Sequence, residues 1–124
     1  FADINPVFDY YTPVIISGNQ FLEEKPDTAK AFLDAVSRGY NYAMSNPEEA
    51  ADILCKAAPE LDKELVLASQ QYLKDQYKAD AAYWGQIDAD RWNGFYQWVN
   101  ENNLLEEEIP LNTGFSNDYL PKAE

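Results

Sequence analysis

The sequence predicts an α/β chain that is mostly helical, with one strand followed by four or five helices. Residues 10–17 are rich in β-branched and aromatic side chains, as strands are. Later segments instead carry apolar residues at helical spacing, and no second strand-like run follows. Because one strand cannot form a sheet, we expect it to pair with another copy or with sequence outside these 124 residues, and we favour the second.

The strand expected at residues 10–17 contains the continuous apolar run Val14, Ile15 and Ile16. Strands that are apolar on both faces are typically central and covered by helices on both sides. Pro13 removes one ladder donor, so an alternative start for the strand is Val14.

Helical patterns follow almost to the end of the chain. Asp27 or Thr28 can cap the first long helix, and Asn46 can cap the second, with Pro47 in its first turn. The last helix carries a stripe at i, i+3, i+4 and i+7 spacing, which we expect to be buried: Trp92, Phe95, Tyr96 and Val99. The expected helices cover about residues 27–45, 47–58, 62–76 and 90–102, preceded by a short helix or turn over 19–24.

Charge and composition exclude several classes of function. The net charge of −13 argues against nucleic acid and against anionic membrane surfaces as partners. With no histidine, this sequence cannot supply a histidine-ligated metal site or a Ser-His-Asp triad. The run Glu106-Glu107-Glu108 predicts a solvated turn, because consecutive carboxylates do not converge on one ion. We therefore expect no catalytic residue, no metal site and no cofactor.

We treat residues 1–124 as one domain, because the sequence has no internal repeat, linker or low-complexity segment. It also contains no signal peptide and no apolar run long enough to span a bilayer. The chain begins at Phe1 rather than at methionine, so we expect it to be a piece of a longer, processed protein.

Several stretches, taken in order and spacing, resemble the C-terminal portion of NMT1/THI5-like solute-binding proteins. The resemblance covers nearly the whole chain. It rests on residues 8–16, 25–32, 38–43 and 46–54, on Arg91-Trp92, and on residues 115–121.

This resemblance implies one lobe of a type II periplasmic-binding-protein fold, with residues 10–17 as a strand crossing the hinge. It implies the substrate-binding component of an ABC importer, with the permease and the remainder of its own chain as partners. Close members bind pyrimidine precursors of thiamine, and relatives bind riboflavin, alkanesulfonates, nitrate or taurine. The expected location is extracytoplasmic, either periplasmic or as a membrane-anchored lipoprotein. A fungal pyrimidine synthase belongs to the same family, but its chemistry depends on a His and a Cys-rich motif that this sequence lacks.

In a two-lobe binder the ligand lies where the crossing strands emerge, so we expect ligand-binding residues near the start of the strand. Tyr10 and Tyr11 can stack on a flat heteroaromatic ring and hydrogen-bond to it. Asp9 can accept a hydrogen bond from a ligand amino group. Trp84, beside Gly85 in an irregular segment, is a further candidate, whereas we assign Trp92 and Trp98 to packing.

Three hypotheses follow. The first is binding of a small heteroaromatic solute, such as a thiamine pyrimidine precursor, without catalysis. The second is a helical protein-interaction or oligomerisation module with no small-molecule ligand, in which the unpaired strand makes a homodimer. The third is an enzyme related to the pyrimidine synthases, for which the residues give no support.

Overall fold

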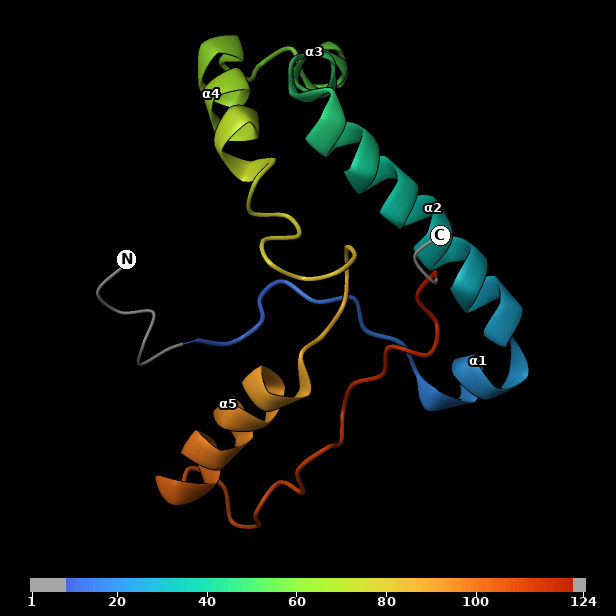
Figure 1. Ribbon diagram of the computed structural model, residues 1–124, viewed down its shortest axis with the longest axis vertical. Helices are drawn as coiled ribbons and strands as arrows, with labels where there is room; N and C mark the ends of the chain where they lie inside the picture. Colours follow the sequence, from blue (N-terminus) through green and yellow to red (C-terminus); the bar gives the residue numbers. More distant parts are fainter. Residues whose placement is uncertain (1–8, 122–124) are drawn as a thin grey trace. The chain divides into compact units, whose positions relative to one another are not determined.

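The computed structural model describes residues 9–121, which contain five helices and no β-strand (Figure 1). The helices are α1 (Asn19–Glu24), α2 (Pro26–Ser45), α3 (Pro47–Ala57), α4 (Lys63–Leu73) and α5 (Ala89–Glu101). The mostly helical class is confirmed. The chain divides into two compact units, the first holding residues 9–24 and 87–118 and the second residues 25–86 and 119–121.

The strand expected over residues 10–17 is absent from the described part of the chain. A strand is defined by backbone pairing, and no other segment of residues 9–121 pairs with this one. Pro13, joined to Thr12 by a cis peptide bond, has no N–H to give to a ladder. The segment is instead non-helical, with Val14, Ile15 and Ile16 exposed to 44, 54 and 86%.

Helix α2 begins one residue before the expected range, at Pro26, with Lys25 rather than Asp27 or Thr28 at the cap position. Proline fits the first turn because the N–H it lacks would have no partner there. Asn46 occupies the cap position of α3, but its side chain makes no capping bond. Its Nδ2 donates to the carbonyl of Tyr42 in the last turn of α2 instead.

Helix α3 packs on α4 within the second unit (Figure 1). Asp62 caps α4 by accepting a hydrogen bond from the N–H of Leu65 (2.9 Å). Lys63 Nζ lies 2.7 Å from Asp52 Oδ1 of α3. A buried Ala51 allows close approach at this contact.

Helix α4 ends at Leu73, three residues before the expected end at residue 76. The N–H groups of Gln76 and Tyr77 both donate to the carbonyl of Leu73, which tightens the chain into a turn. Tyr77 then packs edge-on against Tyr40, and its hydroxyl donates to Gln70 Oε1 (3.0 Å). A tertiary contact thus overrides the helical pattern of the sequence at this end.

Helix α5 begins at Ala89, where Asp88 Oδ1 accepts from the N–H of Arg91 (2.8 Å). Of the expected stripe, Val99 is buried and Trp92 and Tyr96 are half-buried. Phe95 was expected to be buried with them. This prediction is wrong, because Phe95 is 37% exposed. The returning segment 109–117 bonds to Trp92, Asn93 and Asn100, and covers that side of the helix only.

Three asparagine side chains fasten the first unit, each by a pair of hydrogen bonds of 2.8–2.9 Å. Asn100 on α5 donates to the carbonyl of Ile109 and accepts from its N–H. Asn117 makes the same pair with the backbone of Ile87. Asn93 accepts from the N–H of Asn112 and donates to its side-chain oxygen. Each amide therefore acts as a substitute peptide group, and we call these contacts the asparagine clips.

Gly114 allows the returning segment to approach α5 closely. Its φ is +78°, and a Cβ at this position would lie 2.5 Å from Tyr96 Oη. No helix in residues 9–121 is long and apolar enough to cross a membrane.

The Asp52–Lys63 pair predicts a pH dependence for the α3–α4 contact. The hydrogen bond to Lys63 and its positive charge lower the pKa of Asp52. The hydrogen bond to Asp52 and its negative charge raise the pKa of Lys63. The Asp52 contribution is present above its ordinary pKa of 3.8 and is lost as pH falls through the lowered value. The Lys63 contribution is present below 10.5 and is lost as pH rises through the raised value.

We therefore expect Lys63→Met to flatten the dependence of the thermal midpoint on pH at both extremes. The change is small, because the two side chains are 65% and 46% exposed and solvent screens them. Lys30→Met, which removes an exposed charge on α2, is the control. Equal pH profiles for the Lys63 variant and the wild type would contradict the assignment.

The asparagine clips predict that Asn100→Asp destabilises the first unit although the shape of the side chain is unchanged. Aspartate can still accept from the N–H of Ile109, but it places an oxygen against the carbonyl oxygen of Ile109, where asparagine placed a donor. The free energy of unfolding should therefore fall by about 1–3 kcal/mol. Urea unfolding measures this. Gln97→Glu adds the same charge to an exposed position of α5 and should change stability by less than about 0.5 kcal/mol; an equal loss in both variants would refute the role of the clip.

Candidate functional site

Three of the four residues expected to bind ligand lie together in the first unit, held against α5. Asp9, Tyr10 and Tyr11 run along the N-terminal half of this helix. Asp9 and Tyr11 both contact Arg91, and Tyr10 contacts Phe95. Trp84 lies in the second unit. The site is therefore described in two parts.

Arg91 organises the first part. Its Nη2 lies 2.6 Å from Asp9 Oδ1, and its Cζ lies 4.4 Å from the centre of the Tyr11 ring. A guanidinium over a ring is attracted by the negative face of the π system. The side chains of Arg91 and Asp9 are 41% and 59% exposed, so we expect the ion pair itself to be worth less than about 1 kcal/mol.

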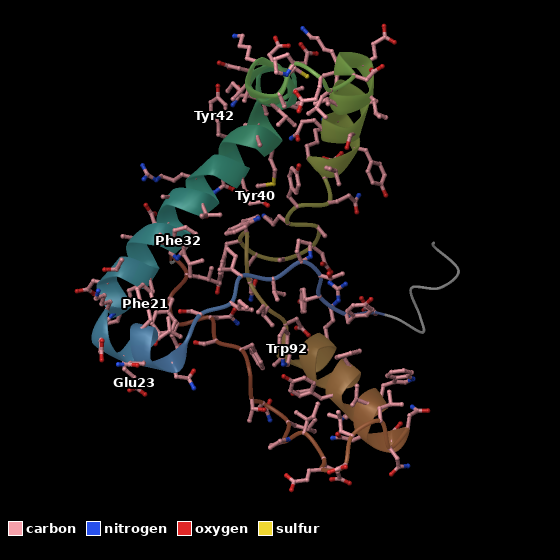
Figure 2. All side chains as sticks on the ribbon, turned by 180° about the vertical axis from the view of Figure 1, so that it is seen from behind. Phe21, Glu23, Phe32, Tyr40, Tyr42 and Trp92 are labelled. Atoms are coloured by element: carbon pink, nitrogen blue, oxygen red, sulfur yellow. The ribbon has the colours of Figure 1, made fainter. Side chains whose placement is uncertain are left out.

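The helix terminus holds Tyr11 from a second direction. The backbone N–H of Asp88, just before α5, donates to the Tyr11 hydroxyl (2.9 Å). Trp92 lies in the first turn of α5 (Figure 2), with its ring centre 6.4 Å from that of Tyr11. One face and the hydroxyl of Tyr11 are thus occupied by the protein itself, so Tyr11 serves to position the segment more than to meet a ligand.

Tyr10 presents its ring differently. Its centre lies 5.2 Å from that of Phe95, the planes are inclined by 30°, and the side chain is 41% exposed. Asp9 and Tyr11 on either side are both held by Arg91. Tyr10 is therefore fixed in place while its ring stays accessible.

Trp84 stacks on Tyr40 of α2, with ring centres 4.4 Å apart and planes at 19°. Figure 2 shows Tyr40 and Tyr42 leaving α2 on different sides, and Tyr40 is the one that meets this loop. Burial, and next the neighbouring Tyr40, raise the pKa of Tyr77 in the same group of rings. Gly85 has a φ of +85°, and a Cβ there would lie 2.9 Å from the side chain of Leu120. Trp84 thus helps to anchor its loop, and only part of its surface is open.

Two groups of this site, Arg91 and Phe95, were not among the ligand-binding residues expected from the sequence. Arg91 is one of two arginines in an acidic chain and lies three residues after the capping Asp88, and these two features were the available signal. Phe95 was assigned to the core by its helical spacing. Its exposure of 37% shows that it faces outward, and there it meets Tyr10.

Neither of two hollows in the described part of the chain is lined by an expected ligand residue. One of about 140 Å³ lies between α3 and α4 beside the Asp52–Lys63 pair, and it is smaller than sites for ring-sized ligands. The other, about 530 Å³ and wide open, lies over the C-terminal half of α5 between Glu101 and Glu108. No group of carboxylates and thiols in residues 9–121 is arranged to hold a metal ion.

The chemistry of this arrangement suits recognition. Aromatic faces, a phenol and a guanidinium–carboxylate pair can stack and hydrogen-bond. Within the described residues, no nucleophile is paired with a base at the site, as acyl or phosphoryl transfer would require. These groups make it a candidate binding surface.

Residues 1–50 match the profile of the family described as NMT1/THI5 like. The formylaminopyrimidine-binding protein of Halalkalibacterium halodurans is 29% identical over 121 residues, which cover 90% of this chain and 36% of that protein. The riboflavin-binding protein RibY of Chloroflexus aurantiacus is 23% identical over 122 residues, or 93% of this chain and 34% of that protein.

An enzyme is also among the relatives. The 4-amino-5-hydroxymethyl-2-methylpyrimidine phosphate synthase of Legionella pneumophila is 26% identical over 98 residues, which cover 79% of this chain and 30% of the enzyme. The chain spans about a third of the length of the curated relatives it matches. Together, the matches confirm the resemblance expected from the sequence.

The contacts of Arg91 predict that Arg91→Met releases residues 9–11 from α5 while the helix stays folded. The variant loses both the ion pair and the cation–π contact but keeps an apolar stem, so we expect a loss of about 1–2 kcal/mol. Nuclear Overhauser contacts between Tyr10 and Phe95 should weaken. Arg38→Met, which breaks an exposed pair with Asp34 on α2, is the matched control, and unchanged Tyr10–Phe95 contacts in Arg91→Met would contradict the role of Arg91.

Proposed function

We propose that this chain, as a relative of NMT1/THI5-like proteins, forms part of the substrate-binding component of an ABC importer for a small heteroaromatic solute. The observation that carries the proposal is the exposed ring of Tyr10. The ring is held in place because the residues on either side of it, Asp9 and Tyr11, both contact Arg91. Flat heteroaromatic ligands stack on such rings. The names of two relatives, a formylaminopyrimidine-binding and a riboflavin-binding protein, support ligands of this class.

The proposed setting is a cleft between two lobes, of which this chain supplies a part. The relatives are about three times as long as the matched region, so further sequence would complete the second wall. The unpaired residues Val14, Ile15 and Ile16 would then pair with strands of that sequence. The proposed location is extracytoplasmic, with a permease as the partner that accepts the solute.

Self-association through the same segment is the second candidate. Three consecutive β-branched residues, each exposed to 44% or more, favour pairing with a second copy. The net charge of −13 opposes it, because like-charged copies repel. An enzymatic role is a weaker alternative that rests on the name of the Legionella relative, since this chain holds no histidine and a single cysteine.

The function is tested by calorimetric titration of the complete natural gene product with formylaminopyrimidine and with riboflavin. We expect one of them to bind tightly without being converted. Failure of both to bind, or turnover of either, would contradict the importer function.

For residues 1–124 alone we expect weak or absent binding of the pyrimidine, because part of the cleft is missing. A dissociation constant of about 1 mM or weaker corresponds to about 4 kcal/mol or less. Light scattering on the same sample reports whether the chain dimerises. Submicromolar binding by the chain alone would show that it holds a whole site, and a stable dimer that ignores both ligands would favour the interaction module.

A further inference from the structure

The pair Asn93-Gly94 in α5 places two groups that can react with each other next to one another in the sequence. It is the only point in the 124 residues at which glycine follows asparagine. Asparagine is chemically labile, because its side-chain carbonyl carbon can be attacked by the backbone nitrogen of the next residue. Glycine favours this attack, since it has no side chain beside the nitrogen and adopts conformations that are closed to other residues. In an unfolded chain, Asn93 is therefore the asparagine that should react fastest.

The reaction consumes water and needs no other reagent. The backbone nitrogen of Gly94 attacks Cγ of Asn93 and forms a new N–Cγ bond. The proton of that N–H passes to the side-chain nitrogen, the bond from Cγ to this nitrogen breaks, and ammonia leaves. Water then opens the cyclic imide at either of its carbonyl groups. One opening gives aspartate, and the other gives isoaspartate, in which the main chain runs through Cβ and Cγ.

Helix α5 prevents the first step while it is folded. Asn93 and Gly94 lie inside Ala89–Glu101, where each backbone N–H points along the helix axis to the carbonyl four residues earlier. The attack requires the nitrogen of Gly94 to turn toward Cγ of Asn93. The helical hydrogen bonds must therefore open at this point before the pair can react.

The asparagine clip of Asn93 prevents the same step from the side-chain end. Asn93 Nδ2 donates to Asn112 Oδ1, and Asn93 Oδ1 accepts from the N–H of Asn112, both at 2.8 Å. The side chain is half-buried, and both of its polar atoms are bonded to the returning segment. Reaction therefore requires the returning segment to detach as well as the helix to open.

Packing does not explain the glycine at position 94. Gly94 is exposed, and a Cβ placed there would meet no atom within 4 Å. In contrast, Gly114 has a positive φ, and a Cβ there would lie 2.5 Å from Tyr96 Oη. A glycine inside a helix lowers stability relative to alanine, because the unfolded chain has more freedom to lose. The helix is thus weakened at the residue whose nitrogen would react.

We propose that Asn93-Gly94 is a self-modification site, closed by α5 and by the clip to Asn112, that converts to aspartate or isoaspartate whenever the first unit opens. Isoaspartate adds one carbon to the main chain inside α5, so the regular hydrogen-bond pattern cannot re-form across it. Aspartate replaces the donor Nδ2 with an oxygen that faces Asn112 Oδ1. The amount of product therefore records how long the first unit has been open, a property that goes beyond solute binding and does not depend on it.

The test incubates the complete natural gene product at mildly alkaline pH in water carrying heavy oxygen, with and without guanidinium chloride. Peptide mapping by mass spectrometry measures conversion at each asparagine, and the heavy oxygen marks conversion that occurred during the incubation. We expect Asn93 to convert fastest in denaturant and at least about ten-fold more slowly in the folded protein, because only the open state reacts. Asn100 and Asn117 are internal controls, since they make similar clips but are followed by Glu101 and Asp118.

Asn112→Gly separates the clip from the helix. It removes the acceptor for Asn93 Nδ2 and tolerates the φ of +59° at this position. Loss of this hydrogen bond should raise conversion in the folded protein about five-fold. Asn112→Asp keeps an acceptor at the same place and should convert at nearly the wild-type rate. Circular dichroism checks that both variants keep their helical content.

Gly94→Ala tests the pair without disturbing the fold. The added methyl group enters open space and favours the helix, so the variant should fold at least as well as the wild type. Conversion at Asn93 should become several-fold slower even in denaturant, and an unchanged rate there would overturn the assignment of the site. Equal conversion of wild-type Asn93 in folded and denatured protein would overturn the closing role of the fold. Equal conversion in folded Asn112→Gly and wild type would overturn the role of the clip.

Discussion

Directional polar contacts hold this chain together, because few apolar side chains are buried. Among residues 9–121, the buried hydrophobic residues are Ala29, Ala51 and Val99, all of them small or medium in size. The first unit depends on the asparagine clips and the second on helix caps, the Asp52–Lys63 pair and the rings around Tyr40. Hydrogen bonds need correct geometry, so they fix the path of the chain even where packing does not.

This reliance on polar contacts also explains why one arginine, Arg91, holds several residues of the first unit. In a chain of net charge −13, a guanidinium attracts whichever carboxylate comes near, and Arg91 finds Asp9 across 82 residues of sequence. The planar group can also lie over Tyr11 while it bonds to Asp9, which an ammonium group does less well. One side chain thus fixes the non-helical segment to the helix and leaves the ring between its two contacts open.

Helices with strong local signals could be predicted from the sequence, and features that depend on distant partners could not. Pro47 after Asn46 places the start of α3, because the fixed φ of proline suits the first turn. The end of α4 depends on Tyr77 reaching Tyr40, a contact that spacing does not reveal. For the site, Tyr10 was identified as an aromatic residue at the start of the segment that was expected to be a strand, residues 10–17. Phe95 was assigned to the core, because periodicity tells which residues share a face but not what covers it.

Pro13 has a second consequence, for solubility. Three consecutive β-branched residues without charge are the kind of sequence that stacks into fibrils when exposed. Val14, Ile15 and Ile16 are exposed, and Pro13 directly precedes them with no N–H to extend such a stack. Ser17 and Gly18 end the apolar run on the other side. The proline that weakens this segment as a strand therefore also acts as a gatekeeper that limits aggregation of the newly made chain.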